Sequence, residues 1–224
     1  MSYLQNGKVS FNWKLPFYGA IGFGIGFALL RVIMITNLNL AQNATADLYT
    51  FHFLDPVIGM RRGFLVGAIG GASLGLAFKD KINSVYFSLS GALGFSTAFA
   101  FVLYIAKDVS DIGWSIEKFI FGSEISYYDP ALAKGVGAGA LIGSLGGLIL
   151  GLASPKGRII SSILLCLTGT IWFVNAFAFG FSIYTGNLNS IWNGVAGAVG
   201  GAIFGFVLGL FYWVHDKIQL CKVS

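Results

Sequence analysis

Apolar residues in this chain gather into six long runs that are separated by shorter polar segments. Each run is close to the roughly 20 residues that a helix needs to cross the hydrocarbon core of a bilayer. The pattern predicts an all-α, polytopic membrane protein with six transmembrane helices, organised as a single integral membrane domain over residues 1–224. The six predicted spans are 16–36, 60–78, 83–106, 133–153, 157–184 and 190–214.

Two longer segments, 37–59 and 107–132, separate predicted spans, and they contain Asp-Pro pairs at 55–56 and 129–130. An aspartate that caps a helix, followed by a proline in the first turn, is a start signal for the second and fourth spans. Residues 112–120 interleave apolar and charged side chains in a short amphipathic pattern. This pattern predicts a helix that lies flat on the membrane surface.

The second, fourth and sixth spans share a stripe of small residues at every fourth position. Such a stripe lets two helix backbones approach closely in lipid. We interpret the stripes as surfaces for tight packing inside the chain, and an association face for a partner subunit or for identical copies is the alternative. The stripes consist of Gly63, Gly67, Gly71 and Gly75, of Gly139, Gly143, Gly147 and Gly151, and of Asn193 followed by Gly197, Gly201, Gly205 and Gly209.

The first, third and fifth spans repeat a different signature, in which a phenylalanine follows a glycine by four residues. The pairs are Gly19 with Phe23, Gly91 with Phe95, and Gly169 with Phe173. Because the two signatures alternate, we predict three tandem glycine-rich helical hairpins, with repeat units of about 16–79, 83–154 and 158–214. All units share one direction in the membrane, so a pseudo-symmetry axis would run along the membrane normal. A quasi-threefold ring and a linear array of hairpins both fit this pattern.

The composition supports a membrane protein and excludes an ordinary soluble domain. Apolar residues make up 56% of the chain and charged residues 10%, against roughly 25% charged residues in soluble domains. The net charge of +5 does not indicate a nucleic-acid partner, because most basic residues stand singly beside apolar runs, where they orient the chain and contact headgroups. We expect membrane lipids and other membrane protein subunits, or identical copies, as partners, and no nucleic acid.

The short joints at 79–81 and 154–158 are basic. Because short basic loops favour the cytoplasmic or matrix side, we expect these joints and both termini to lie there. This orientation predicts the cytoplasmic (inner) membrane of a prokaryote or an organellar inner membrane. The charge bias is modest, since Arg61 and Arg62 flank the second span on the other side.

Four basic residues near the predicted outer ends of spans are candidates for contact with a lipid or an anion: Arg31, Arg61, Arg62 and Lys134. Arg31 lies five residues inside the end of the first span. Its simpler interpretation is a side chain that reaches the interface by snorkelling. The sharper hypothesis is a basic ring that faces phosphates or anionic lipid.

Polar residues inside the predicted spans are few. Thr97 and Asn175 occupy equivalent positions in the third and fifth spans, and Asn193 begins the stripe of the sixth. Hydrogen bonding between helices is their default interpretation, and the lining of a polar path is the alternative.

The sequence contains little that indicates chemistry. No acidic residue falls in the middle of a predicted span, which counts against a proton-coupled transporter. Nucleotide-binding loops and metal-ligand clusters are absent from the sequence, so we expect no enzymatic activity, no cofactor and no metal. The leading hypothesis is a structural or assembly subunit of a larger membrane protein complex, and the alternative is a small channel or transporter for a neutral or anionic solute.

Overall fold

A computed structural model of the chain describes residues 3–5, 8–41, 56–78, 81–105, 108–121, 130–183 and 190–221. For residues 3–5, 8–9, 30–41, 130–132, 178–183 and 190–193, and for positions 110, 117, 120 and 121, it describes the backbone alone. The side chains of Arg31 and Asn193 therefore lie outside the described residues, as does most of the predicted segment 37–59.

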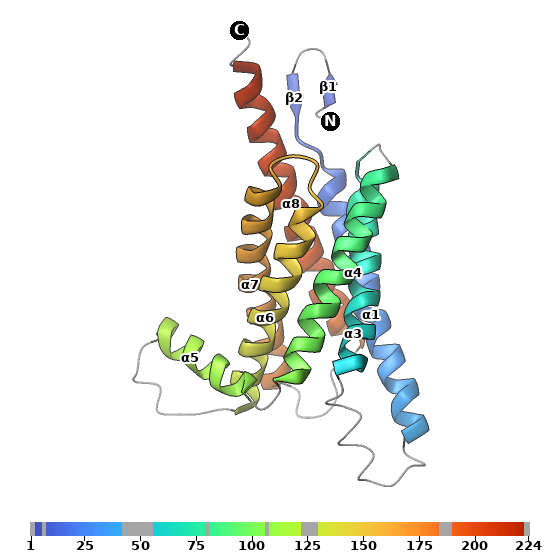
Figure 1. Ribbon diagram of the computed structural model, residues 1–224, viewed down its shortest axis with the longest axis vertical. Helices are drawn as coiled ribbons and strands as arrows, with labels where there is room; N and C mark the ends of the chain where they lie inside the picture. Colours follow the sequence, from blue (N-terminus) through green and yellow to red (C-terminus); the bar gives the residue numbers. More distant parts are fainter. Residues whose placement is uncertain are drawn as a thin grey trace.

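Seven α-helices make up nearly all of the described residues (Figure 1). Two of them, α3 and α6, begin at Pro56 and Pro130, which confirms the helix starts that the two Asp-Pro pairs predicted. The helices are α1 (Lys14–Ala41), α3 (Pro56–Leu76), α4 (Lys81–Tyr104), α5 (Val109–Phe121), α6 (Pro130–Leu152), α7 (Arg158–Ile183) and α8 (Ser190–Cys221).

A short antiparallel hairpin precedes α1, and the hydrophobic pattern did not predict it. It pairs β1 (Tyr3–Gln5) with β2 (Lys8–Ser10). In the sequence Asn6 and Gly7 stand between the strands, and this dipeptide is typical of two-residue hairpin turns. Each strand has only three residues, too few for an alternating pattern to be recognised. The regular structure of the described residues is therefore all-α apart from this hairpin.

Among the described residues, four helical segments are long and apolar enough to cross a membrane, which indicates an integral membrane protein. The described part of α1 adds a shorter apolar stretch, Lys14–Leu29. The four segments are Lys81–Tyr104, Ala133–Leu152, Arg158–Phe177 and Gly194–Cys221.

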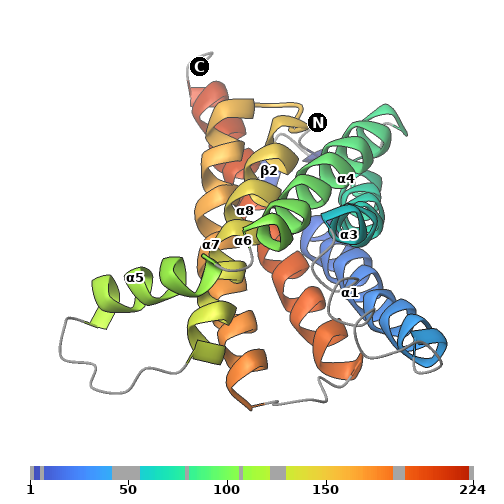
Figure 2. The same cartoon turned by 60° about the horizontal axis from the view of Figure 1, so that its bottom comes forward.

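The helices form one bundle in which α3 packs most extensively against α4, α6 against α7, and α8 against α1. Figure 2 shows α8 beside α1 although these helices lie at opposite ends of the sequence. The closest pairs therefore join each glycine-stripe helix to the helix that follows it, with α8 returning to α1. The predicted hairpin partners α1 and α3, and α4 and α6, are also in contact, over smaller areas.

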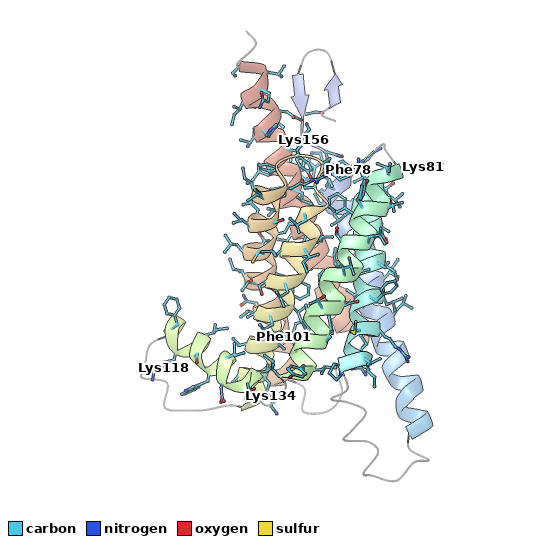
Figure 3. All side chains as sticks on the ribbon, in the orientation of Figure 1. Phe78, Lys81, Phe101, Lys118, Lys134 and Lys156 are labelled. Carbon is cyan, nitrogen blue, oxygen red and sulfur yellow. The ribbon has the colours of Figure 1, made fainter. Side chains whose placement is uncertain are left out.

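The two ends of the bundle differ. At one end, here named the short-loop end, Lys81 and Lys156 lie near the β-hairpin and the last turns of α8 (Figures 1 and 3). At the other, the α5 end, Lys134 and Phe101 lie at the end of the bundle and Lys118 lies on the projecting helix α5 (Figure 3). Basic side chains thus occur at both ends, as expected for two membrane interfaces.

Helix α5 runs away from the bundle at a steep angle to the other helices (Figure 1). Its first turn packs on α6: Val109 is buried, and a methyl group at Gly113 would overlap the Ala133 backbone. Further along, Phe119 is 90% exposed. The helix predicted over 112–120 is therefore present, and only its beginning is covered by the described chain.

Phenylalanine rings fill the middle of the bundle. Phe23, Phe95, Phe173 and Phe204, from α1, α4, α7 and α8, are each at most 2% exposed. Their ring centroids are 5.4 Å apart for Phe23 and Phe95, 6.0 Å for Phe95 and Phe173, and 5.6 Å for Phe23 and Phe204. These separations are typical of aromatic pairs in contact, so the interior at this level is an apolar core.

Candidate functional site

The glycines of α3 lie against the backbone of α4. A methyl group at Gly63, Gly67 or Gly71 would overlap a carbonyl oxygen of α4, belonging to Phe95, Gly91 or Phe87 respectively. At Gly75 it would overlap the backbone of Ser84. Only glycine permits this approach, because any larger residue places its Cβ where the neighbouring backbone already lies.

The glycines of α6 and α8 stand in the same relation to α7 and α1. In the centre of each contact two glycines face one another, so that each would clash with its partner if it carried a methyl group. The reciprocal pairs are Gly67 with Gly91, Gly143 with Gly169, and Gly201 with Gly19. The remaining stripe residues meet Phe173 (Gly139), Leu165 (Gly147), Ser162 (Gly151), Phe23 (Gly197), Leu15 (Gly205) and the Phe11 ring (Gly209).

A second small face of α8 also points into the chain. A methyl group at Gly194 would lie 3.3 Å from the Ala28 Cβ, and one at Gly24 would lie 3.1 Å from the Ala198 Cβ. Both small-residue faces of α8 therefore lie against α1. Among the described residues the stripes contact helices of this chain, which leaves no stripe exposed for a partner.

Serines of α4 supplement the close approach of α3 and α4. Ser84, Ser88 and Ser96 donate hydrogen bonds of 3.0, 3.1 and 2.9 Å to the carbonyl oxygens of Ala72, Ala68 and Met60. The sequence interpretation missed these residues. Their spacing of four and eight residues, in step with the glycine stripe of α3, was the available signal.

A polar cluster at the short-loop end was also missed. The Ser154 hydroxyl donates to the Lys156 carbonyl at 2.6 Å and accepts from Ser161 at 2.9 Å, so the Tyr212 hydroxyl, at 2.6 Å, donates to Ser154. The Lys156 ammonium forms an ion pair with Asp216 of α8. This cluster holds the joint between α6 and α7 against α8, and its partners are 58 and 60 residues apart in sequence.

The structure describes the side chains of three of the four basic candidate residues. Arg61 is exposed and Arg62 half-buried on α3, whereas Lys134 is exposed on α6. The side chain of Arg31 is outside the described residues. Arg61 and Arg62 line the same cavity, and Lys134 is not among the described residues that line it.

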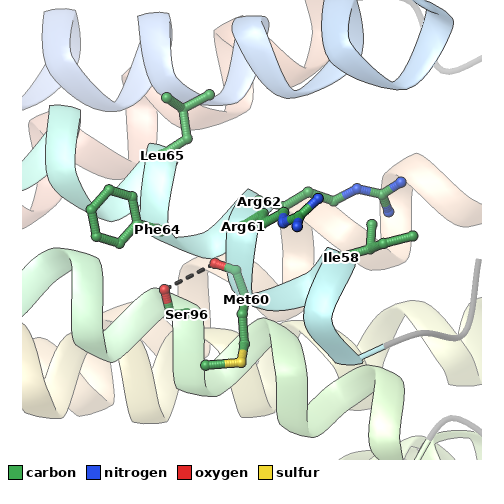
Figure 4. Close-up of a pocket in the computed structure, with 7 residues that line it drawn as sticks. All are labelled: Ile58, Met60, Arg61, Arg62, Phe64, Leu65 and Ser96. Carbon is green, nitrogen blue, oxygen red and sulfur yellow. Dashed lines mark hydrogen bonds between the residues drawn. The ribbon is translucent and has the colours of Figure 1, made fainter. Parts of the chain in front are cut away.

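That cavity, here named the arginine groove, has a volume of about 510 Å³. It lies along the start of α3, with Ser96 of α4 at its edge, where the Ser96 hydroxyl donates a hydrogen bond to the Met60 carbonyl (Figure 4). In Figure 4 both arginine side chains extend towards the first turn of α3, where Ile58 lies. The groove is lined by Ile58, Met60, Arg61, Arg62, Phe64, Leu65 and Ser96.

Two of the three candidates for a polar path have described side chains, and both lie at the surface of the bundle. Thr97 of α4 and Asn175 of α7 are exposed, and the Asn175 amide donates a 2.7 Å hydrogen bond to the Ile171 carbonyl of its own helix. Asn193 lies outside the residues whose side chains are described. The buried positions in the middle of the bundle are occupied by the phenylalanine core.

Within the described ranges, no three His, Cys, Asp or Glu side chains come together in a way that suits a metal ion. The fold and its contacts define a class, an integral membrane protein built from tightly packed helices. Comparison of the chain with known protein families, with curated proteins and with solved structures finds no match.

Proposed function

We propose that α1 and α3 cross the membrane together with the four helical segments of membrane-spanning length and hydropathy, which makes six spans. For α3, the support is the length of its contact with α4, which runs from Gly63, opposite Phe95, to Gly75, opposite Ser84. Arg61 and Arg62 lower the hydropathy of α3, but their long side chains extend towards the helix end (Figure 4). In this arrangement α5 lies along the membrane surface, with its exposed apolar side chains in the headgroup region.

We further propose that the spans are three tandem repeats arranged as a quasi-threefold ring. Three reciprocal glycine pairs occur at matching positions of the three closest helix pairs. A linear array would leave α1 and α8 at opposite ends, whereas α8 packs against α1. In the proposed orientation the short-loop end and both termini face the cytoplasm or matrix of a prokaryotic or organellar inner membrane.

On this basis we propose that the protein is a structural or assembly subunit of a larger membrane protein complex. The carrying observation is the phenylalanine core: Phe23, Phe95, Phe173 and Phe204 occupy the place where a path along the ring axis would have to run. Three of the four buried serines that the structure describes, Ser96, Ser154 and Ser161, bond backbone or one another, whereas the Ser162 hydroxyl has no hydrogen-bond partner among the described residues. Polar groups used in this way stabilise a scaffold and leave little to coordinate a solute.

The partner surfaces in this proposal are the outer faces of the bundle and α5, because the glycine stripes are occupied within the chain. Leu93 of α4 and Ile171 of α7 are exposed apolar residues on such faces. Lipid covers these faces where no subunit does. Exposed apolar side chains by themselves need no protein partner in a membrane, because lipid covers them. The steep projection of α5 from the bundle is therefore the more specific indication of a partner surface.

The proposal is tested by native mass spectrometry of the full chain, extracted from its own membrane in mild detergent, with identification of every co-purifying chain. Stoichiometric foreign subunits would support a structural role. The channel or transporter alternative predicts a lone protomer or a closed homo-oligomer that carries solute flux in vesicles. If Asn175→Leu abolished such flux and the neighbouring exposed variant Ile171→Leu did not, the structural proposal would be wrong.

A further inference from the structure

We propose that the arginine groove binds one anionic phospholipid, with the lipid phosphate against Arg61 and Arg62 and an acyl chain along Met60, Phe64 and Leu65. This inference concerns a specific lipid site and does not depend on whether the protein is a subunit or a transporter. It rests on the groove, on the order of its charged and apolar residues, and on where the groove lies along α3.

The groove has the polarity gradient of a phospholipid. Side chains of a helix tilt towards its N-terminus, so the guanidinium groups of Arg61 and Arg62 extend towards the first turn of α3. Phe64 and Leu65 lie further from the helix end (Figure 4). A lipid aligned with the bundle presents its phosphate at the interface and its chains at greater depth, which is the same order.

The chemistry of the two arginines suits a phosphate. A guanidinium group offers planar, paired N–H donors that match phosphate oxygens, and it keeps its charge when it is partly desolvated. Arg61 is exposed and Arg62 half-buried, so one group is accessible from the headgroup region while the other sits closer to the helix contact. None of the seven described lining residues is acidic, and two of them carry a positive charge.

The apolar part of the groove favours a lipid over a soluble anion. Met60 and Phe64 are 51% and 57% exposed, and they lie on α3, which packs in the bundle beside a membrane-spanning helix. The cavity volume of about 510 Å³ falls within the roughly 300–1,000 Å³ of ligand pockets, which are mostly lined by apolar side chains. A free phosphate would use the arginines and leave this lining unoccupied.

The test uses the full chain, purified, stripped of lipid and titrated with phosphatidylglycerol or phosphatidylcholine, with bound lipid counted by native mass spectrometry. We expect one phosphatidylglycerol to bind preferentially to the unaltered chain. The double variant Arg61→Gln/Arg62→Gln should weaken this binding about tenfold or more, because it removes both charge-assisted contacts. Lys134→Gln, which removes an exposed charge outside the groove lining, is the matched control and should bind as the unaltered chain does.

A second variant tests the apolar half of the site. Met60→Trp retains both arginines but fills the groove, and it should also reduce phosphatidylglycerol binding. Equal binding of the two lipids, or an equal loss with Lys134→Gln, would overturn the proposal in favour of general attraction to positive charge. Competition by millimolar inorganic phosphate would overturn it in favour of a soluble anion. Thermal unfolding of each variant shows whether a loss of binding is due to misfolding. If the double variant misfolds, the deciding measurement is phosphatidylglycerol binding to Arg61→Gln alone, because Arg61 is exposed.

Discussion

Replacing Gly67 by alanine tests whether the close approach of α3 and α4 holds the bundle together. The added methyl group would overlap the carbonyl oxygen of Gly91, and Gly91 meets Gly67 in the same way. A backbone atom cannot rotate aside as a side chain can, so the two helices must separate locally. Carbon contacts are most favourable at about 3.5–4.0 Å, and the serine hydrogen bonds from α4 to α3 would lengthen with the separation.

The expected cost follows from two opposing effects. Overpacking costs about 1–3 kcal/mol, and a clash with backbone belongs near the upper end of that range. Alanine has a helix propensity about 1 kcal/mol better than glycine, which offsets part of the loss. We therefore expect Gly67→Ala to lower the free energy of unfolding by about 2 kcal/mol.

Gly194→Ala is the matched control, because it makes the same substitution in a helix where the nearest atom of another helix, the Ala28 Cβ, is 3.3 Å away. It should change stability by less than about 1 kcal/mol in either direction, because a small shift of the Ala28 methyl group opposes the better helix propensity of alanine. Thermal unfolding of the purified protein in mild detergent measures both. For a chain of this length about 2 kcal/mol corresponds to roughly 4–8 °C in Tm. If Gly67→Ala were as stable as the unaltered chain, or if Gly194→Ala lost as much, close helix approach would not explain the stripe.

Three further predictions follow from the core, the short-loop end and the orientation. Phe95→Ala should lower the free energy of unfolding by about 3–5 kcal/mol, since it empties part of a closed aromatic core, and a loss below 1 kcal/mol in a detergent unfolding titration would contradict that packing. Asp216→Asn should cost about 1 kcal/mol by removing the ion pair with Lys156, and this loss should shrink at high salt, so a salt-independent Tm difference would speak against the ion pair. In a variant without its two native cysteines, Ser110→Cys should react with an impermeant reagent from outside, whereas Lys156→Cys should react only after permeabilisation, and the reverse pattern would invert the proposed orientation.

Much of the secondary structure could be predicted from local pattern. The apolar runs correspond to helices of membrane-spanning length in α4, α6, α7 and α8, and the prolines at 56 and 130 begin α3 and α6. The β-hairpin was missed because three residues a strand are too few to show a period. The four-residue spacing of the glycines was visible, and it indicated close packing without indicating which backbone each glycine would meet.

The sequence by itself determined which segments are helical, where small residues line a helix face, and where arginines and lysines stand. These properties depend on hydrophobicity and on the 3.6-residue period of a helix, which are local. Only the tertiary structure decided that α8 packs against α1, that Ser154 bonds Tyr212, and that Arg61 and Arg62 share a groove without Lys134 in its described lining. Such contacts join residues that are distant in the chain, and they depend on how whole helices fit together, which no local pattern encodes.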